Sequence, residues 1–154
     1  MTTLQIPIDS QYGYVIALGI VFFVQQQLFF AIPVSFVRKK YKIRPPTMYP
    51  SDSLIKELKL QKEDVMKYNS VQRVHQQNVE ILVTFLPMFF VAGLYDPMFT
   101  CYAGIVVFIG RTITAIGYYY DPNARLFGAF YHFGEFYIVY LCGRFAYSLL
   151  SKSA

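Results

Sequence analysis

The chain has 154 residues, of which 55% are hydrophobic and only 15% are charged, whereas about 25% are charged in an average soluble domain. This balance excludes a disordered chain and argues against a soluble enzyme, and the two cysteines are too few for a disulfide framework. The net charge of +5 comes mainly from the segment between Arg38 and Arg73, which holds ten of the 14 Lys and Arg residues. Because this segment lies between long apolar stretches, we predict a basic loop at a membrane surface and not a nucleic-acid interface.

Four apolar stretches follow one another along the chain, and a helix needs about 20 such residues to cross a bilayer. They cover residues 14–37, 71–95, 98–120 and 126–150, and none shows the alternation of a strand. The second is apolar only from Val79 and reaches this length by extension through a polar stretch. The sequence therefore predicts an all-α fold, an integral membrane four-helix bundle, in a single transmembrane domain over residues 1–154.

The links between these stretches differ in length and charge. The basic loop, residues 38–70, contains a stretch from Ser51 to Lys67 that we predict to form a short amphipathic helix capped by Ser51 or Asp52. The other two links are short turns, in which proline removes a backbone donor. They are Asp96-Pro97 and Asp121-Pro122-Asn123.

Basic residues gather on one side of the predicted bundle. The first and third links together with Arg73 hold eleven of them, whereas the segment before Tyr14 and the second link hold none. The positive-inside rule then places both termini away from the basic side. Since the first 37 residues contain no Lys or Arg, neither a cleavable signal nor a transit peptide is evident. We expect a protein surrounded by lipids in the endoplasmic reticulum or the mitochondrial inner membrane.

Ionisable side chains inside apolar helices are costly, and they usually face protein or a water-filled cavity. Arg73, Gln77 and Glu80 fall on one narrow face of a helix. Two interpretations stay open. One is a salt-bridged helix entry, and the other is a ligand site that offers a cation and a carboxylate, as a zwitterionic peptide-like ligand requires. Arg111, deep in the third helix, is expected to form a buried bridge with Glu80.

The fourth apolar stretch carries an unusual set of polar residues. His132 and Glu135 share one face, whereas Arg144 lies about 180° round the helix, so each group needs its own partner. The cysteines have no ligand spacing, and we expect no metal. A haem bound by His75 and His132 is an alternative for a four-helix membrane protein.

Three segments resemble one family of membrane proteins. They are R-K-K-Y-K-I-R-P-P-T-M-Y from Arg38 to Tyr49, Q-R-V-H-Q-Q-N-V-E from Gln72 to Glu80, and G-R-x-x-x-x-x-G-Y-Y from Gly110 to Tyr119. On these segments the chain resembles the MAPEG family, the membrane-associated proteins in eicosanoid and glutathione metabolism. It is most similar to the type-3 microsomal glutathione transferases.

This resemblance implies a homotrimer that binds glutathione, as co-substrate, between subunits near the basic face. The matching glutathione-binding positions are Arg38, Arg73, Gln77, Glu80, Arg111 and Tyr118. Arg125 would be the catalytic residue, since a cation beside the thiol favours the thiolate. The thiolate would attack a lipophilic electrophile or a lipid hydroperoxide, which makes the protein a membrane-bound glutathione transferase or peroxidase.

The chain departs from the family pattern at several positions. Gln77 stands where the family has asparagine, Thr114 stands where a tyrosine is expected, and the fourth helix carries Glu135 and Arg144. These departures support a second interpretation, in which the protein is an accessory or structural subunit of a larger membrane assembly, such as a mitochondrial respiratory-chain complex.

Overall fold

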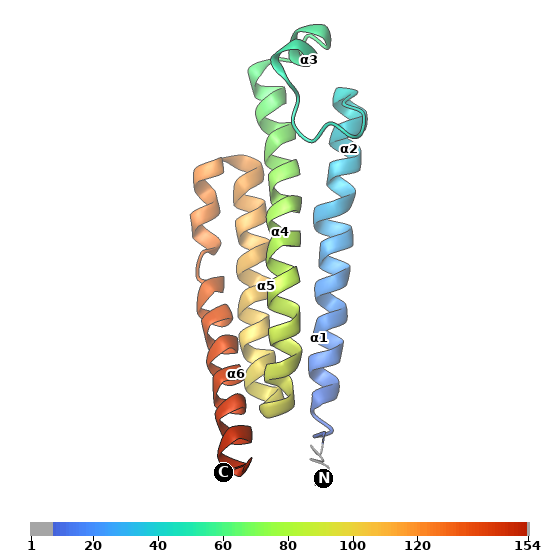
Figure 1. Ribbon diagram of the computed structural model, residues 1–154. Helices are drawn as coiled ribbons and strands as arrows, with labels where there is room; N and C mark the ends of the chain where they lie inside the picture. Colours follow the sequence, from blue (N-terminus) through green and yellow to red (C-terminus); the bar gives the residue numbers. More distant parts are fainter. Residues whose placement is uncertain (1–7, 154) are drawn as a thin grey trace.

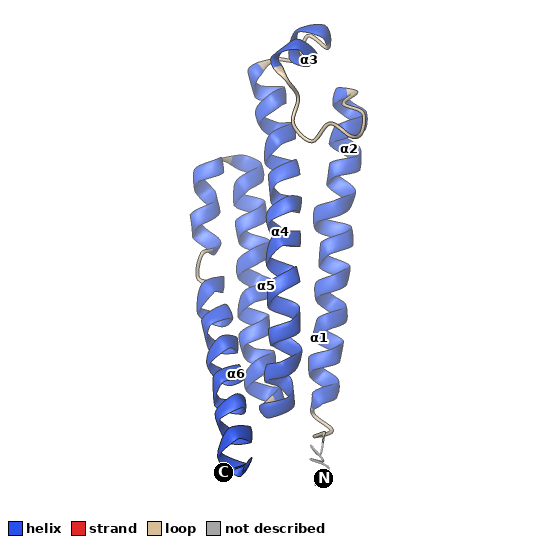
Figure 2. Ribbon diagram, in the orientation of Figure 1, coloured by secondary structure: helices blue, strands red, loops and turns tan. Residues whose placement is uncertain are grey.

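The fold is a bundle of long helices that run roughly along one axis (Figure 1). A computed structural model of the protein describes residues 8–153, except for the side chains of Pro122 and Ser153. Across these residues the regular structure is entirely helical, which confirms the predicted all-α class (Figure 2). The start of α1 and the end of α6 lie at one end of the bundle, and the basic loop lies at the other (Figure 1).

The first long helix consists of three consecutive parts. They are α1 (Tyr12–Gln25), the π-helical stretch η1 (Gln26–Ala31) and α2 (Ile32–Tyr41). Because Pro33 has no N–H, the carbonyl of Phe29 lacks its usual donor four residues later, and the Tyr119 hydroxyl donates to it at 3.2 Å. π-Helical turns are frequent at functional sites, and this one contains the buried side chain of Gln26.

The basic loop contains the short helix α3 (Asp52–Glu57), which ends well before the predicted boundary. Ser51 caps it as predicted, since its hydroxyl accepts the N–H of Leu54 at 3.4 Å. The helix stops because Lys59 adopts a left-handed backbone with φ of 51°. Leu54 and Leu58 pack against a small cluster of buried residues, Tyr41, Ile43 and Tyr68.

The second long helix, α4 (Lys62–Tyr95), begins nine residues before the predicted start at residue 71. A capping box starts it, in which the N–H of Gln61 donates to the Asp64 carboxylate at 3.2 Å and the Gln61 side chain receives the N–H of Asp64. The predicted boundary was wrong because the polar first turns of α4 are held by capping and not by apolar burial. As a result, α4 extends beyond the end of its neighbour α5 (Figure 1).

The last two helices form a hairpin with a 3₁₀ segment between them. Asp96 caps α5 (Pro97–Tyr120) by accepting the N–H of Phe99 at 3.1 Å. After Asp121 the chain forms η2 (Pro122–Gly128), and α6 (Tyr131–Ser153) begins only then. The predicted start of the fourth helix at residue 126 is therefore wrong.

Three of these helices are long and apolar enough to cross a membrane within the described residues: Tyr12–Tyr41, Lys62–Tyr95 and Pro97–Tyr120. The 23-residue helix α6 has sufficient length but is not among them, because polar side chains interrupt its apolar sequence. It still packs along α4 and α5 and contributes Ile138 and Leu141 to the core. The centre of that core is aromatic, with Phe22 in edge-to-face contact with Phe85, Phe89 and Phe108.

Glycines allow η2 to lie directly on α5. A Cβ atom at Gly128 would collide with the carbonyl oxygen of Gly110 and with Thr114, and one at Gly117 would lie 2.5 Å from the carbonyl oxygen of Ala124. Backbone atoms cannot move aside as a flexible side chain can. The small residues on α5 therefore fix the position of η2, and with it that of Arg125.

Replacing Gly128 with alanine should lower the free energy of unfolding by about 3 kcal/mol, because the added methyl group forces α5 and η2 apart. The measurement is thermal unfolding of the purified protein in mild detergent. The matched control is Gly143→Ala in α6, where an added Cβ atom meets nothing within 4 Å. Equal melting temperatures for the two variants would show that the close approach of η2 does not matter.

Candidate functional site

A cavity of about 290 Å³ lies near the basic end of the bundle, between α4, α5, η2 and the start of α6. Five of the seven predicted site residues line it, namely Arg73, Gln77, Glu80, Arg111 and Arg125. The rest of its wall consists of Ile81, Thr114, Leu126, Ala129, Tyr131 and His132. The structure thus brings together residues that are up to 59 positions apart in the sequence, from Arg73 to His132.

Arg73 and Glu80 form an ion pair along the exposed side of α4, with 3.6 Å between Nη1 and Oε1. Their side chains are 39% and 53% exposed. Such exposed pairs contribute only about 0–1 kcal/mol. The salt-bridged helix entry therefore exists, but a ligand with a carboxylate and an amino group can replace it at little cost.

Arg111 is buried and does not form the predicted bridge with Glu80. Its Nε instead donates to Oδ1 of Asn78 at 3.0 Å, and Nδ2 of Asn78 donates to Oε1 of Gln26 at 2.6 Å. Its guanidinium also lies over the Tyr131 ring, 4.9 Å from the centroid. The prediction was wrong because Asn78 points into the bundle, where it reaches Arg111 first, whereas Glu80 lies on the exposed face.

Arg125 is exposed on η2, and its guanidinium lies 5.7 Å from the centroid of the Tyr118 ring. Asp121 holds the start of η2, since its carboxylate accepts the N–H of Asn123 at 2.9 Å. Arg125 therefore presents a cation at the rim of the cavity from a segment whose backbone is fixed on α5.

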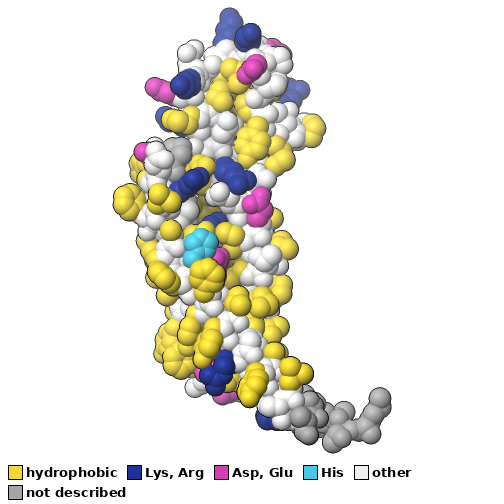
Figure 3. All heavy atoms as spheres, turned by 60° about the vertical axis from the view of Figure 1, so that its left-hand side comes forward, with side chains coloured by type: hydrophobic (Ala, Val, Ile, Leu, Met, Phe, Trp, Pro, Cys, Tyr) yellow, Lys and Arg dark blue, Asp and Glu magenta, His cyan; other side chains and the backbone are white. Residues whose placement is uncertain are grey.

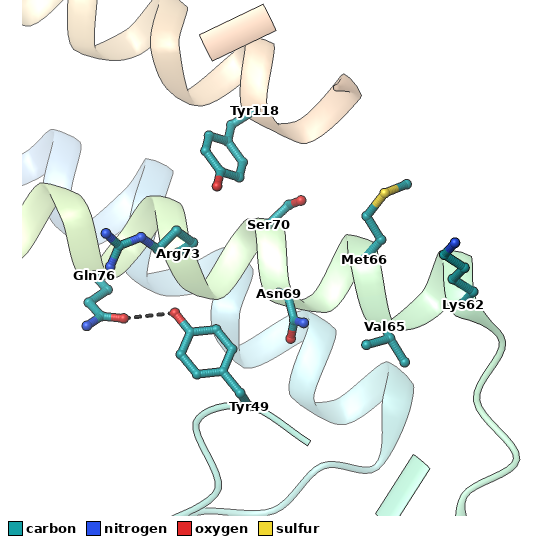
Figure 4. A pocket seen from close by; sticks show the side chains of 9 residues that line it. All are labelled: Tyr49, Lys62, Val65, Met66, Asn69, Ser70, Arg73, Gln76 and Tyr118. Carbon is teal, nitrogen blue, oxygen red and sulfur yellow. Dashed lines mark hydrogen bonds between the residues drawn. The ribbon is translucent and has the colours of Figure 1, made fainter. Parts of the chain in front are cut away.

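Tyr118 lines a second cavity, of about 640 Å³, that shares Arg73 with the first (Figure 4). This larger cavity lies between α4, the end of α5 and the basic loop. Its wall includes Tyr49, whose hydroxyl is 2.8 Å from Oε1 of Gln76. In Figure 4 the Tyr118 hydroxyl points toward α4. The two cavities adjoin at Arg73, which lines both of them.

Arg38 is the one predicted site residue that lines neither cavity. Its Nη1 donates to the carbonyl of Thr47 at 2.8 Å, its Nη2 lies 3.5 Å from Oε1 of Gln72, and its guanidinium is 5.9 Å from the centre of the Tyr68 ring. Arg38 therefore links the basic loop to α4.

Three residues of the site gave little sequence signal. Tyr131 is one of 14 tyrosines, and Asn78 is one position away from the expected asparagine, so neither was assigned a role. His132 was noted on one face with Glu135 and, in the haem alternative, with His75, and its Nδ1 lies 2.7 Å from Oε2 of Glu135. His75, the other histidine, lines neither of these two cavities.

The charge of the cavity wall is clearly positive. Three arginines, Arg73, Arg111 and Arg125, face one carboxylate, Glu80. Arginine binds carboxylates in two parallel hydrogen bonds, and an acid is the natural partner of an ammonium group. The wall matches a ligand with more than one carboxylate and a single amino group. Over residues 8–153, no three His, Cys, Asp or Glu side chains gather as a metal-binding group.

Comparison with known proteins gives one family match. The family model for MAPEG matches residues 15–147, which include every residue that lines the two cavities and all seven predicted site residues.

Proposed function

Because the chain belongs to the MAPEG family, whose members use glutathione in membranes, we propose that it is a membrane-bound glutathione transferase or peroxidase. The observation that carries this proposal is the cavity where Arg73, Gln77, Glu80, Arg111 and Arg125 converge. Its substrates would be lipophilic electrophiles or lipid hydroperoxides, which reach the protein through the bilayer.

The polar side chains of this cavity have separate roles in binding glutathione. Arg73 and Arg111 bind the two carboxylates of glutathione, and Glu80 binds its amino group. Gln77 lies between Arg73 and Glu80 on α4, and its side-chain amide takes over the hydrogen bonds of the family's asparagine. At Thr114 the chain lacks the tyrosine hydroxyl of the family pattern, and the buried Tyr131 lines the same cavity as Thr114.

Arg125 is proposed to bind the sulfur atom. A guanidinium beside a thiol favours the charged form and lowers the pKa of the thiol, so that glutathione reacts as the thiolate. Since Arg125 lies at the open rim, the sulfur would face the side of the bundle from which a lipophilic substrate arrives.

We further propose that the active form is a homotrimer. The cavity is built on the flank of one subunit, with Glu80, Arg125 and His132 all exposed. A neighbouring copy would cover this flank, and its own Arg38 side would then complete the binding site. Either the endoplasmic reticulum or the mitochondrial inner membrane is consistent with this arrangement.

Replacing Glu80 with glutamine should weaken glutathione binding about tenfold, because the ligand's ammonium group loses its acidic partner. The same substitution should barely change the affinity for a glutathione analogue that lacks the amino group. Calorimetric titration of the detergent-purified protein with both ligands measures the two affinities.

The matched control for this titration is Glu57→Gln in α3, a carboxylate outside both cavities. Loss of affinity for both ligands in Glu80→Gln would contradict the role given to Glu80. No binding of glutathione by the unchanged protein would contradict the proposed function itself.

A second candidate function is supported by the surface of α6. Large apolar side chains on this helix are strongly exposed: Phe133, Phe136, Tyr147 and Leu150 are 70–75% exposed. Arg144 lies among them and contacts the Tyr140 hydroxyl at 2.9 Å. Such a face suits a protein neighbour as well as lipid, as in a subunit of a larger membrane assembly. The native size after mild extraction distinguishes this assembly from a trimer of about three times 17.9 kDa.

A further inference from the structure

His132 lies where two chemically different cavities meet. On one side is the arginine-rich cavity described above. On the other, between α4 and α6, is an apolar cavity of about 340 Å³ with a wall that includes Phe85, Met88, Phe136 and Val139. In Figure 3, a histidine side chain on this face has basic side chains above it and hydrophobic side chains below it. A group at this junction can act on two ligands at once, one polar and one lipophilic.

The imidazole is held in one orientation by its neighbours. Its Nδ1 lies 2.7 Å from Oε2 of Glu135, one turn further along α6. Its ring lies 4.1 Å from the centroid of the Tyr131 ring and 6.3 Å from that of Phe136. Because a carboxylate engages Nδ1, Nε2 is the nitrogen that can exchange a proton with another molecule.

The apolar cavity has the character of a site for an acyl chain. It opens between two helices, in the part of the bundle where the exposed side chains are apolar, and its only ionisable wall residues are His132 and Glu135 at one end. Ile81 and His132 are shared with the polar cavity, so the two spaces are adjacent. An acyl chain bound in this cavity would bring a reactive oxygen close to His132 and to the position proposed for the glutathione sulfur.

We propose that His132 is the proton donor for the reduction of a lipid hydroperoxide, and that the apolar cavity holds the acyl chain of this substrate. The inference rests on the proposed glutathione site and names the substrate class and a further residue for it. Glu135 is the positioning residue that orients the imidazole.

The glutathione thiolate attacks the outer oxygen of the hydroperoxide, an S–O bond forms and the O–O bond breaks. The sulfur loses two electrons and becomes a sulfenic acid, while the released alkoxide takes the proton from His132 and leaves as the alcohol. A second glutathione thiol converts the sulfenic acid to the disulfide and water, and solvent returns the proton to the imidazole.

The charges around His132 suit a donor in this step. Arg73 and Glu80 face it from α4, Arg111 from α5, Arg125 from η2, and Tyr131 and Glu135 from its own helix. An alkoxide is a poor leaving group and needs its proton as the O–O bond breaks. A halide ion, in contrast, leaves without taking up a proton. His132 is therefore needed for turnover of a hydroperoxide and is dispensable for turnover of an aryl halide.

This difference supplies the test. Glutathione-dependent turnover of a fatty-acid hydroperoxide and of an activated aryl halide is measured on the same preparation of His132→Gln in mild detergent. The ratio of hydroperoxide to aryl halide turnover is expected to fall at least tenfold. A smaller fall in the same direction is expected for Glu135→Gln, which keeps the hydrogen bond but not the charge. Because each ratio comes from one preparation, partial loss of folded protein cancels.

The control is His75→Gln, which removes the other histidine and should leave the ratio as it is in the unchanged protein. An unchanged ratio in His132→Gln, in a protein active on both substrates, would overturn the role of His132 and leave the glutathione site standing. If the unchanged protein is active on neither substrate, the proposed function fails and this inference fails with it.

Discussion

Replacing Arg125 with alanine is expected to lower glutathione-dependent turnover about 100-fold while the protein still folds and binds glutathione. A cation about 4 Å from a thiolate contributes a few kcal/mol near a protein surface, and removing one such stabilising group typically costs 10²–10³ in rate. The side chain is exposed, and it contacts only the face of the Tyr118 ring among the described interactions, so little packing is lost. Turnover at saturating glutathione, together with the ultraviolet absorbance of the bound thiolate, provides the measurement.

Two further arginine variants make this experiment selective. Arg125→Lys keeps the charge and should retain part of the thiolate. Arg144→Ala removes an equally exposed arginine from the far part of α6, where it contacts Tyr140, and should leave the absorbance of the bound thiolate as it was. If Arg125→Ala forms the thiolate as well as the unchanged protein does, another group activates the sulfur and the assigned role is wrong.

Replacing Asn78 with leucine is expected to lower the free energy of unfolding by about 3 kcal/mol. Leucine has the same branched shape and the same number of side-chain heavy atoms, but it leaves the buried Nε of Arg111 without its acceptor and Oε1 of Gln26 without its donor. Buried polar groups that lose a partner cost roughly 1–3 kcal/mol, and charged groups cost more. Thermal unfolding measures the loss, and Asn69→Leu is the matched control, because no hydrogen bond reaches Oδ1 of Asn69 in the described part of the chain.

The double variant Asn78→Leu with Arg111→Met separates stability from binding. Replacing both partners by apolar groups of similar shape should restore much of the stability lost in the single variant. Glutathione binding should remain weak, since one of the cavity's three arginines is gone. If the double variant is as unstable as the sum of the two single variants, Asn78 and Arg111 do not stabilise each other.

The sequence was sufficient to predict the helical class, the basic loop and the polar residues that α4 contributes to the cavity. These features depend on hydrophobic length and on helical periodicity, which places Arg73, Gln77 and Glu80 on one face whatever the rest of the fold does. Membership of one helix face is a local property. The prediction that Arg125 joins them came from family resemblance, and the structure brings it to the same cavity through η2.

What the sequence did not predict depends on contacts between segments. The start of α6 is delayed because Gly128 allows η2 to rest on α5, and nothing near residue 126 indicates a partner surface. The pairing of Arg111 with Asn78 depends on which side of α4 faces α5. The early start of α4 did have a local signal, the capping residues Gln61 and Asp64, but hydropathy outweighed it.

The length of α4 has a consequence for how the protein would meet the two substrates proposed for it. Its 34 residues span about 51 Å at 1.5 Å per residue, whereas the hydrocarbon core of a bilayer is about 30 Å thick. Some of the helix must therefore stand in water, and its basic end carries the larger cavity there. A water-soluble tripeptide would reach the protein by diffusion through the aqueous solution, whereas a lipid would reach it by diffusion within the plane of the bilayer. For the lipid, the concentration that governs turnover is its mole fraction in the bilayer, so inert lipid would act as a diluent even when the bulk concentration is fixed.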